Sequence, residues 1–197
     1  TIRNWDYGAY GEVSITDCMR HSLNTCMVWM AEEIGPDTFY AYLKAFGFDQ
    51  KTGIDLGGET HFPLKVPGKG GWAEVDLATN AFGQGLSVTP IQMAMAVGAL
   101  ANEGKMYVPH VVKAVIIDGK RYEVDPVLAG TPVTADTARK VTEMLTETLM
   151  DESYEKAYID GYTFAGKTGT GQIASDGGYT NPLTNTSFVG WGPSEDP

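Results

Sequence analysis

The residue types best suited to chemistry lie at positions 166–171, which read Gly-Lys-Thr-Gly-Thr-Gly. Small residues on an extended strand leave its edge open, so a peptide ligand can pair with the backbone as an added strand. Lys167 and Thr168 can then bind a carboxylate group of that ligand. A second Lys-Thr-Gly occurs at 51–53, so the tripeptide alone does not decide the question.

The same segment also satisfies the phosphate-binding pattern Gly-x4-Gly-Lys-Thr, which here begins at Gly161. Residues 162–164 are Tyr-Thr-Phe, which favour a strand, whereas a phosphate-cradling loop uses small residues. No helical pattern follows Thr168, and a P-loop needs one. We therefore favour peptide binding, with a nucleotide site as the alternative for this segment.

Two further groupings contain a serine. Ser22 and Asn24 are one residue apart, a spacing that also occurs at an ordinary helix start. Ser153 and Lys156 form the only Ser-x-x-Lys pattern of the chain, in a polar stretch. A serine nucleophile needs an adjacent base, and the sequence places none beside either serine. We expect Ser153 and Lys156 to lie in a solvated helix end or loop.

The elements that position these residues follow from capping signals and periodicity. Ser-Ile-Thr-Asp at 14–17 is a capping box, which predicts a helix that bends near Ser22 and resumes as far as Gly35. Pro36 suits the first turn of another helix, which we expect to end at Gly47.

The remaining elements are predicted in the same way. The glycine-rich stretch 53–71 is expected to be a loop. Beyond it we expect a helix from the Thr89-Pro90 cap to 101, a hairpin of strands 111–117 and 120–124, a long helix after Thr134, and strands at 162–172 and 186–191. The irregular order of helices and strands predicts an α/β (α+β) fold in which helices flank an antiparallel-rich sheet.

Composition limits the class of partner. The 197 residues, 43% hydrophobic and 20% charged, suit one globular domain. Their net charge of −11 argues against nucleic acid and against anionic membrane surfaces, because both carry negative charge. No apolar run is long enough to span a membrane, and the chain does not begin with a signal peptide. The two ends of the sequence resemble cut ends, so we expect a longer parent protein.

Cysteine and histidine do not form a metal-binding pattern. The three histidines are scattered along the chain, so we expect no metal site. On one continuous helix, Cys18 and Cys26 would be about 12 Å apart, too far for a disulfide. A bend between them would shorten that distance, but free thiols are the prediction.

Five segments, in order and across nearly the whole chain, resemble the transpeptidase domain of class B penicillin-binding proteins. One contains the Ser-x-Asn of residues 22–24, and another contains the Lys-Thr-Gly of residues 167–169. The others are Phe-Gly-Phe…Thr-Gly-Ile-Asp-Leu at 46–56, Gly-Gln-Gly…Thr-Pro-Ile-Gln at 83–92, and Ser-Phe-Val-Gly-Trp at 187–191. The resemblance identifies the Lys-Thr-Gly at 51–53 as a chance occurrence.

The resemblance implies a penicillin-binding/β-lactamase-like fold and a D,D-transpeptidase activity. Such enzymes cross-link peptidoglycan stem peptides that end in D-Ala-D-Ala, through a serine acyl-enzyme, and β-lactams trap that intermediate. It also implies an extracytoplasmic location at the bacterial membrane through the anchor of the parent protein, and a place among cell-wall synthesis proteins. No metal or organic cofactor is implied.

The resemblance also assigns roles to three catalytic residues. Ser22 would relay a proton to the leaving amine. Asn24 would hydrogen-bond the donor amide and the lysine of the missing motif. Lys167 would supply positive potential and support Ser22.

On the same strand the resemblance implies a substrate-binding surface. Thr168 would bind the carboxylate of the substrate or antibiotic, and Gly169 belongs to the same binding segment. The backbone N–H of Thr170 would be one donor of the oxyanion hole.

One family motif is absent from its expected place. The nucleophilic Ser-x-x-Lys should precede Ser22, and residues 1–21 contain none. We therefore expect residues 1–197 to be a partial transpeptidase domain, truncated on its N-terminal side and inactive alone. The alternatives are a β-lactam sensor or β-lactamase-like domain, and a non-catalytic binding module of the same fold.

Overall fold

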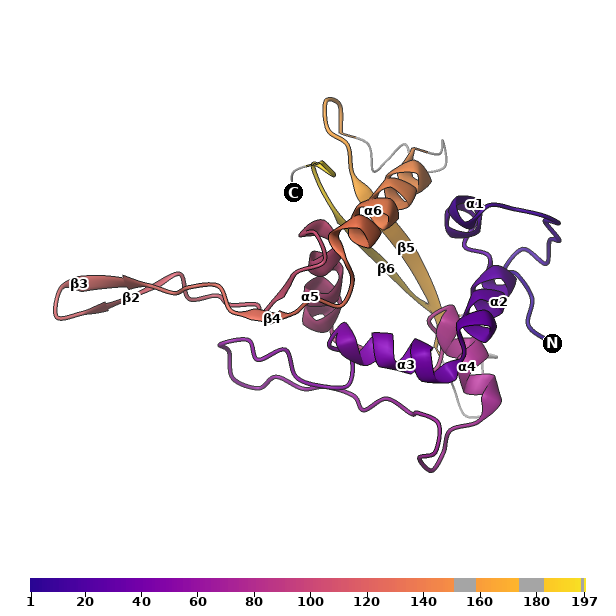
Figure 1. Cartoon of the computed structure of the whole chain (residues 1–197), viewed down its shortest axis with the longest axis horizontal. Coiled ribbons are helices and arrows are strands. Elements are labelled where there is room, and N and C mark those ends of the chain that lie inside the picture. Colours follow the sequence, from indigo (N-terminus) through magenta and orange to yellow (C-terminus); the bar gives the residue numbers. More distant parts are fainter. Residues whose placement is uncertain (151–158, 174–182, 196) are drawn as a thin grey trace. The chain divides into compact units, whose positions relative to one another are not determined.

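The computed structural model describes residues 1–150, 159–173, 183–195 and 197. Figure 1 labels the helices and strands of the chain. The chain divides into two compact units. The first unit consists of Thr1–Phe39, Lys65–Leu86 and Lys140–Pro197, and the second of Tyr40–Leu64 and Ser87–Arg139. Two of the four unit boundaries fall within helices, namely α3 (Pro36–Ala45) and α6 (Ala135–Leu149).

The described part of the first unit contains three complete helices and one strand pair, besides parts of α3 and α6. The helices are α1 (Ile15–Arg20), α2 (Asn24–Ile34) and α4 (Glu74–Ala81), and the strands are β5 (Ala165–Gln172) and β6 (Thr184–Trp191). Helix α2 packs against α4. Strands β5 and β6 pair antiparallel along their whole length, with Lys167 opposite Val189.

Local signals explain where the helices of the first unit begin and end. Helix α1 starts at the predicted capping box, in which the Asp17 N–H donates to Ser14 Oγ at 3.1 Å. Helix α2 stops at Gly35, whose φ of 77° suits glycine. Helix α4 was not predicted from the sequence, because its N-cap is Ala73, which offers no capping side chain.

The second unit contains helix α5 (Pro90–Ala101), which starts at the predicted Thr89 cap. Strand β1 (Met106–Tyr107) pairs antiparallel with β4 (Leu128–Gly130). The core of this unit packs Met95 and Ala99 of α5 against Met106, with Phe46 at its edge.

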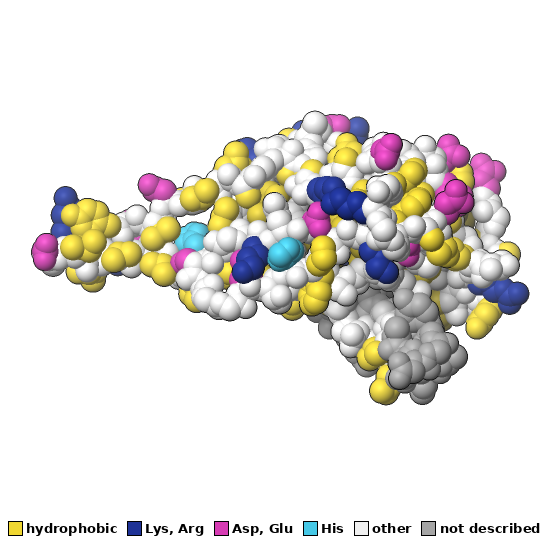
Figure 2. Space-filling view, turned by 90° about the horizontal axis from the view of Figure 1, so that it is seen from below, with side chains coloured by type: hydrophobic (Ala, Val, Ile, Leu, Met, Phe, Trp, Pro, Cys, Tyr) yellow, Lys and Arg dark blue, Asp and Glu magenta, His cyan; other side chains and the backbone are white. Residues whose placement is uncertain are grey.

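The predicted hairpin is present in the second unit as β2 (Ala114–Ile117) and β3 (Lys120–Glu123). Asp118 and Gly119 form its turn with φ values of 50° and 74°, as the two-residue turn requires. Its hydrophobic side chains, among them Ile116 and Ile117, are exposed to solvent (Figure 2). Strand β2 begins three residues later than predicted.

The prediction of free thiols was wrong. Cys18 and Cys26 form a disulfide, and their Cα atoms are 6.0 Å apart. The chain breaks its helical path between Arg20 and Asn24, so the two cysteines lie on different helices and the rise along one helix does not apply. A bend was predicted near Ser22, but its size could not be estimated from the sequence.

The mixture of helices and antiparallel strands agrees with the predicted fold class. Within the described residues the strands form three separate two-stranded ladders. No helix in this part of the chain is both long and apolar enough to cross a bilayer. Ser153 and Lys156 lie outside the described residues.

Candidate active site

Lys167 and Ser22, 145 residues apart in sequence, meet in the first unit. Lys167 Nζ donates a hydrogen bond to Ser22 Oγ and a second one, of 3.2 Å, to the carbonyl oxygen of Thr168. The lysine side chain is half-buried, and this burial lowers the pKa of Lys167 below its ordinary value of 10.5. The structure thus brings together two of the three predicted catalytic residues.

The turn that presents Ser22 is a Schellman motif at the end of α1. The Ser22 N–H donates to the carbonyl oxygen of Met19 at 3.2 Å, and the Leu23 N–H donates to that of Cys18 at 2.9 Å. Ser22 occupies the position of this motif that glycine usually fills, and its φ is 51°. A serine therefore adopts a left-handed conformation that costs a residue with a Cβ about 1–2 kcal/mol.

Two features fix the position of this turn. Leu23 and Cys18 are 2% and 1% exposed, so the residues whose backbone groups close the motif are fully packed. The Cys18–Cys26 disulfide joins the last turns of α1 to the first turn of α2 across Ser22. The serine hydroxyl therefore projects from a rigid support.

Asn24 lies at the start of α2, and its side chain contacts the N-terminal segment. Asn24 Nδ2 donates to the carbonyl oxygen of Arg3 at 3.0 Å. Beside it, Asn4 Oδ1 accepts from both the N–H and the hydroxyl of Thr25, each at 3.1 Å. Leu23, at the N-cap of α2, has no polar side chain that could accept these bonds. The buried Asn4, 20 positions before the first residue of α2, caps the helix in its place.

The backbone of β5 presents part of the predicted substrate-binding segment on the side away from β6. The N–H of Ile173 donates to the carbonyl oxygen of Leu183, which continues the register of the β5–β6 ladder. The backbone N–H and C=O groups of the odd-numbered residues of β5 therefore point towards β6. Because hydrogen-bonding direction alternates along an antiparallel strand, the Thr170 N–H points away from β6. In the described part of the chain no other strand pairs with β5.

The exposure of the residues of β5 also alternates along the strand. Thr168 and Thr170 are exposed, whereas Lys167 and Gly169 are half-buried. A Cβ on Gly169 would lie 2.6 Å from the Ser187 hydroxyl on β6, so a larger residue there would require the Ser187 side chain to rotate. The hydroxyls of Thr168 and Thr170 thus form a polar surface beside the open edge.

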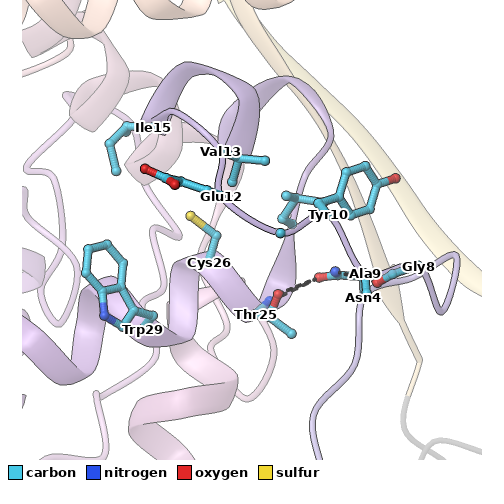
Figure 3. Close-up of a pocket in the computed structure, with 12 residues that line it drawn as sticks. Asn4, Gly8, Ala9, Tyr10, Glu12, Val13, Ile15, Thr25, Cys26 and Trp29 are labelled. Carbon is cyan, nitrogen blue, oxygen red and sulfur yellow. Dashed lines mark hydrogen bonds between the residues drawn. The ribbon is translucent and has the colours of Figure 1, made fainter.

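A pocket of about 470 Å³ lies next to this site, between residues 4–15 and α2 (Figure 3). Its wall includes Leu23, Thr25 and Cys26 but neither Ser22 nor Lys167, so it is distinct from the lysine–serine contact. Glu12 and Trp29 also line it. Within the described residues, no three His, Cys, Asp or Glu side chains gather closely enough to bind a metal ion.

The arrangement is suited to proton transfer at a serine. Lys167 donates to Ser22 Oγ, so the hydroxyl proton of Ser22 can be directed to a third group. A lysine whose pKa is lowered exchanges a proton more readily near neutral pH. The N–H of Thr170 at the open edge can stabilise negative charge on an oxygen of a strand-like ligand.

Two supporting features were missed by the sequence analysis, namely the Asn4 cap and the disulfide. The only local signal for the cap is Leu23, which cannot cap the helix that follows it. Neither feature follows from local patterns, because both depend on how separate segments pack.

Comparison with known sequences identifies the family to which these motifs point. A family model described as "Penicillin binding protein transpeptidase domain" matches residues 1–197. Stage V sporulation protein D of Bacillus subtilis is 36% identical over 202 residues, which cover 100% of this chain and 30% of that protein. Penicillin-binding protein PbpB of Mycobacterium tuberculosis is 31% identical over 203 residues, covering 98% of this chain and 30% of that protein. The chain therefore spans about a third of the length of these relatives.

Solved structures agree with this assignment. Penicillin binding protein 3 of Mycobacterium tuberculosis, complexed with aztreonam, matches with a TM-score of 0.82 and 31% identity, over 93% of this chain and 43% of that chain. Penicillin-binding protein A of the same organism matches with a TM-score of 0.85 over 100% of this chain and 44% of that chain, and at 22% identity it supports the fold alone. The predicted fold class is confirmed.

Proposed function

The chain belongs to the penicillin-binding protein transpeptidase family, and on this premise we propose that it is part of a D,D-transpeptidase. Its substrates are peptidoglycan stem peptides that end in D-Ala-D-Ala, and it joins them through a serine acyl-enzyme. The hydrogen bond between Lys167 Nζ and Ser22 Oγ, beside the open edge of β5, is the observation that carries the proposal.

The site residues divide the reaction between them. A serine nucleophile attacks the carbonyl of the penultimate D-Ala, and the bond to the terminal D-Ala breaks. The proton that the nucleophilic serine loses is relayed through Ser22 to the departing amine, so Ser22 keeps its own hydroxyl, which Lys167 orients through a hydrogen bond. Asn24 hydrogen-bonds the amide of the donor peptide. An acceptor amine then attacks the acyl-enzyme, which forms the cross-link and releases the nucleophilic serine.

Binding of the donor peptide depends on β5. The peptide lies along the open edge as an added strand, with its terminal carboxylate at Thr168. Gly169, which lies between Thr168 and Thr170 in this segment, leaves room for the Ser187 hydroxyl of β6. The Thr170 N–H, which points to this edge, stabilises the oxyanion of the tetrahedral intermediate.

This domain acts within a longer polypeptide. Curated relatives are about three times its length, and residues 1–21 lack the Ser-x-x-Lys that supplies the nucleophile in this family. The longer polypeptide binds β-lactams, as the aztreonam and ampicillin complexes of similar structures suggest. It works on the extracytoplasmic side of the membrane together with other cell-wall synthesis proteins.

Labelling of the longer polypeptide with a fluorescent penicillin tests this function. The wild type is expected to form a stable covalent adduct. Lys167→Ala and Asn24→Ala are each expected to slow labelling strongly while the fold is retained. Ser153→Ala serves as the control, since it alters the other Ser-x-x-Lys pattern and should label at the wild-type rate. Unchanged labelling of Lys167→Ala would contradict the assigned role.

The same experiment separates the alternatives. Rapid hydrolysis of the bound penicillin would indicate a β-lactamase. Absence of any Ser-x-x-Lys in the longer polypeptide, together with no labelling, would indicate a non-catalytic binding module. The fragment of residues 1–197 alone is expected not to be labelled.

A further inference from the structure

Two glutamine side chains meet at the end of β5 that lies away from Lys167. Gln84 Nε2 donates a hydrogen bond of 3.2 Å to Gln172 Oε1, although the two residues are 88 positions apart in sequence. Gln172 is the last residue of β5, and Gln84 follows the end of α4. Both residues belong to the first compact unit, which also contains Ser22 and Lys167.

The turn after α4 holds Gln84 in this place. The Gly83 N–H donates to the carbonyl oxygen of Asn80 at 3.0 Å, and the Gln84 N–H donates to that of Thr79 at 3.0 Å. This is a second Schellman motif, and Gly83, with φ of 89°, fills its left-handed position. Helix ends of the same design therefore present Ser22 to Lys167 and Gln84 to Gln172.

Gln172 shares one face of β5 with the residues that bind substrate in the proposed function. Side chains alternate along a strand, so Thr168, Thr170 and Gln172 project to the same side, and all three are exposed. Thr168 and Gln172 are four positions apart along the strand, which corresponds to about 13 Å. A donor peptide whose carboxylate is at Thr168 brings the residue that precedes D-Ala-D-Ala close to Gln172.

The charges around the glutamine pair disfavour an anion. From Thr168 to Pro197 the sequence has no Lys or Arg, and it has three acidic residues. The stretch from 70 to 104, which contains Gln84, also has no Lys or Arg. The nearest cation along β5 is Lys167, about 17 Å from Gln172 at the usual strand rise. A carboxylate at this position would have no positive partner from these segments.

We propose that Gln84 and Gln172 form a subsite for an uncharged carboxamide on the residue that precedes D-Ala-D-Ala in the donor peptide. This rests on the proposed function. A carboxamide both donates and accepts hydrogen bonds, and so do the two glutamines, whereas a carboxylate only accepts and carries a charge. The subsite therefore selects an amidated donor peptide over the same peptide with a free acid.

Two matched peptides test the proposal. Both end in D-Ala-D-Ala, and they differ only in whether the preceding side chain carries a carboxamide or a carboxylate. We expect the longer wild-type polypeptide to release D-Ala from the amidated peptide with a kcat/KM about threefold to tenfold higher, the range of one net hydrogen bond. Equal kcat/KM values for the two peptides would overturn the proposal.

A change of charge at the subsite should alter the ratio of kcat/KM for the two peptides, which a purely structural role of Gln172 would leave unchanged. Gln172→Arg adds a cation on the exposed face of β5 and is expected to reverse the preference towards the free acid. Gln50→Arg makes the same change in the second unit, where only the backbone oxygen of Gln50 accepts a bond from Gln92, and should keep the wild-type ratio. A wild-type ratio in Gln172→Arg would also overturn the proposal.

Penicillin labelling keeps the two hypotheses apart. If the wild-type polypeptide forms the covalent penicillin adduct but treats the two peptides equally, the subsite is refuted and the transpeptidase function stands. If neither adduct nor D-Ala release is detected, the proposed function itself fails.

Discussion

The backbone of Ser22 adopts a conformation that a glycine would adopt without strain. Its φ of 51° closes the Schellman motif at the end of α1, and its hydroxyl accepts a hydrogen bond from Lys167. A glycine would satisfy the motif but would remove the hydroxyl. At this position the residue that is best for local stability, glycine, lacks the hydroxyl that Lys167 contacts.

Two substitutions separate these effects. Ser22→Gly and Ser22→Ala both remove the hydroxyl, but only alanine keeps the Cβ that the left-handed conformation disfavours. We expect Ser22→Gly to be more stable than Ser22→Ala by about 1 kcal/mol, measured as the free energy of unfolding in urea. Equal stability of the two variants would show that the turn relaxes in solution.

The titration of Lys167 makes the folding stability of the protein depend on pH in the alkaline range. Burial lowers the pKa of Lys167 in the folded state below its unfolded value of 10.5. Between these two values the unfolded chain binds more protons, so the contribution of Lys167 to stability rises with pH through this window. The charged lysine is therefore least favourable to folding below its folded-state pKa.

Lys167→Met removes this titration while keeping most of the side-chain volume. We expect the stability of the wild type, relative to Lys167→Met, to increase as the pH rises towards 10.5. Urea unfolding of both proteins across the alkaline range measures the difference. A constant difference at every pH would mean that the ammonium is fully solvated.

At the scale of elements, the junction of α1 and α2 depends on a segment far from it in sequence. Asn4 caps α2, and Trp5 Nε1 donates to the carbonyl oxygen of His21 at 3.3 Å. The N-terminal segment thus fastens both helix ends that flank Ser22.

Substitution of Asn4 tests this capping. Asn4→Ala removes the oxygen that accepts from Thr25, and we expect a loss of about 1 kcal/mol in unfolding free energy. Asn4→Asp keeps the acceptor and adds a negative charge at a helix N-terminus, so it should retain most of that stability. A larger loss for Asn4→Asp than for Asn4→Ala would show that burying a carboxylate beside the Gly8 carbonyl oxygen costs more than the cap contributes.

The sequence predicted elements whose determinants are local. The capping boxes at Ser14 and Thr89 and the Asp118-Gly119 turn each involve residues within four positions, and all three were confirmed. The pairing of β1 with β4 joins strands of two and three residues, too short for a periodic pattern. Helix α4 lacks a polar N-cap, so its start had no recognised signal.

The candidate site was predictable only through family resemblance. Nothing in the residues around Ser22 indicates that Lys167 lies beside it, because 145 residues separate them. The motif order supplied that pairing, and the roles assigned to Asn24, Thr168, Gly169 and Thr170 remain predictions. The disulfide was mispredicted for a related reason, since the angle between two helices is a property of tertiary packing.

At the scale of the whole molecule, hydrogen-bonded carboxylates make the folding stability depend on pH in the acid range. Bonds from backbone N–H groups of Val111 and Val112 lower the pKa of Asp55, and bonds from Thr52 lower that of Glu59. Side-chain hydroxyls lower the pKa of three more carboxyl groups, those of Asp6, Asp17 and Glu195. All five groups are ionised in the folded state at neutral pH.

Their depressed pKa values make the folded chain sensitive to acid. The stability they contribute is present above the ordinary values of 3.8 and 4.5 and is lost as the pH falls through the folded-state values. We expect the unfolding free energy to decline below about pH 4.5, and to decline less steeply in Asp55→Asn. Urea titrations from about pH 6 to about pH 2 measure this. An unfolding free energy that stays constant over that range would contradict the expectation.

The left-handed serine at the end of α1 has a consequence for protein engineering. A stabilisation programme that replaces every non-glycine residue of positive φ with glycine would select Ser22 early, and it would remove the hydroxyl that accepts the hydrogen bond from Lys167. The same mismatch can serve as a search criterion. In another chain, a serine in the left-handed position of a helix end, hydrogen-bonded to a lysine on a strand, is a position to test for a chemical role before any motif is compared.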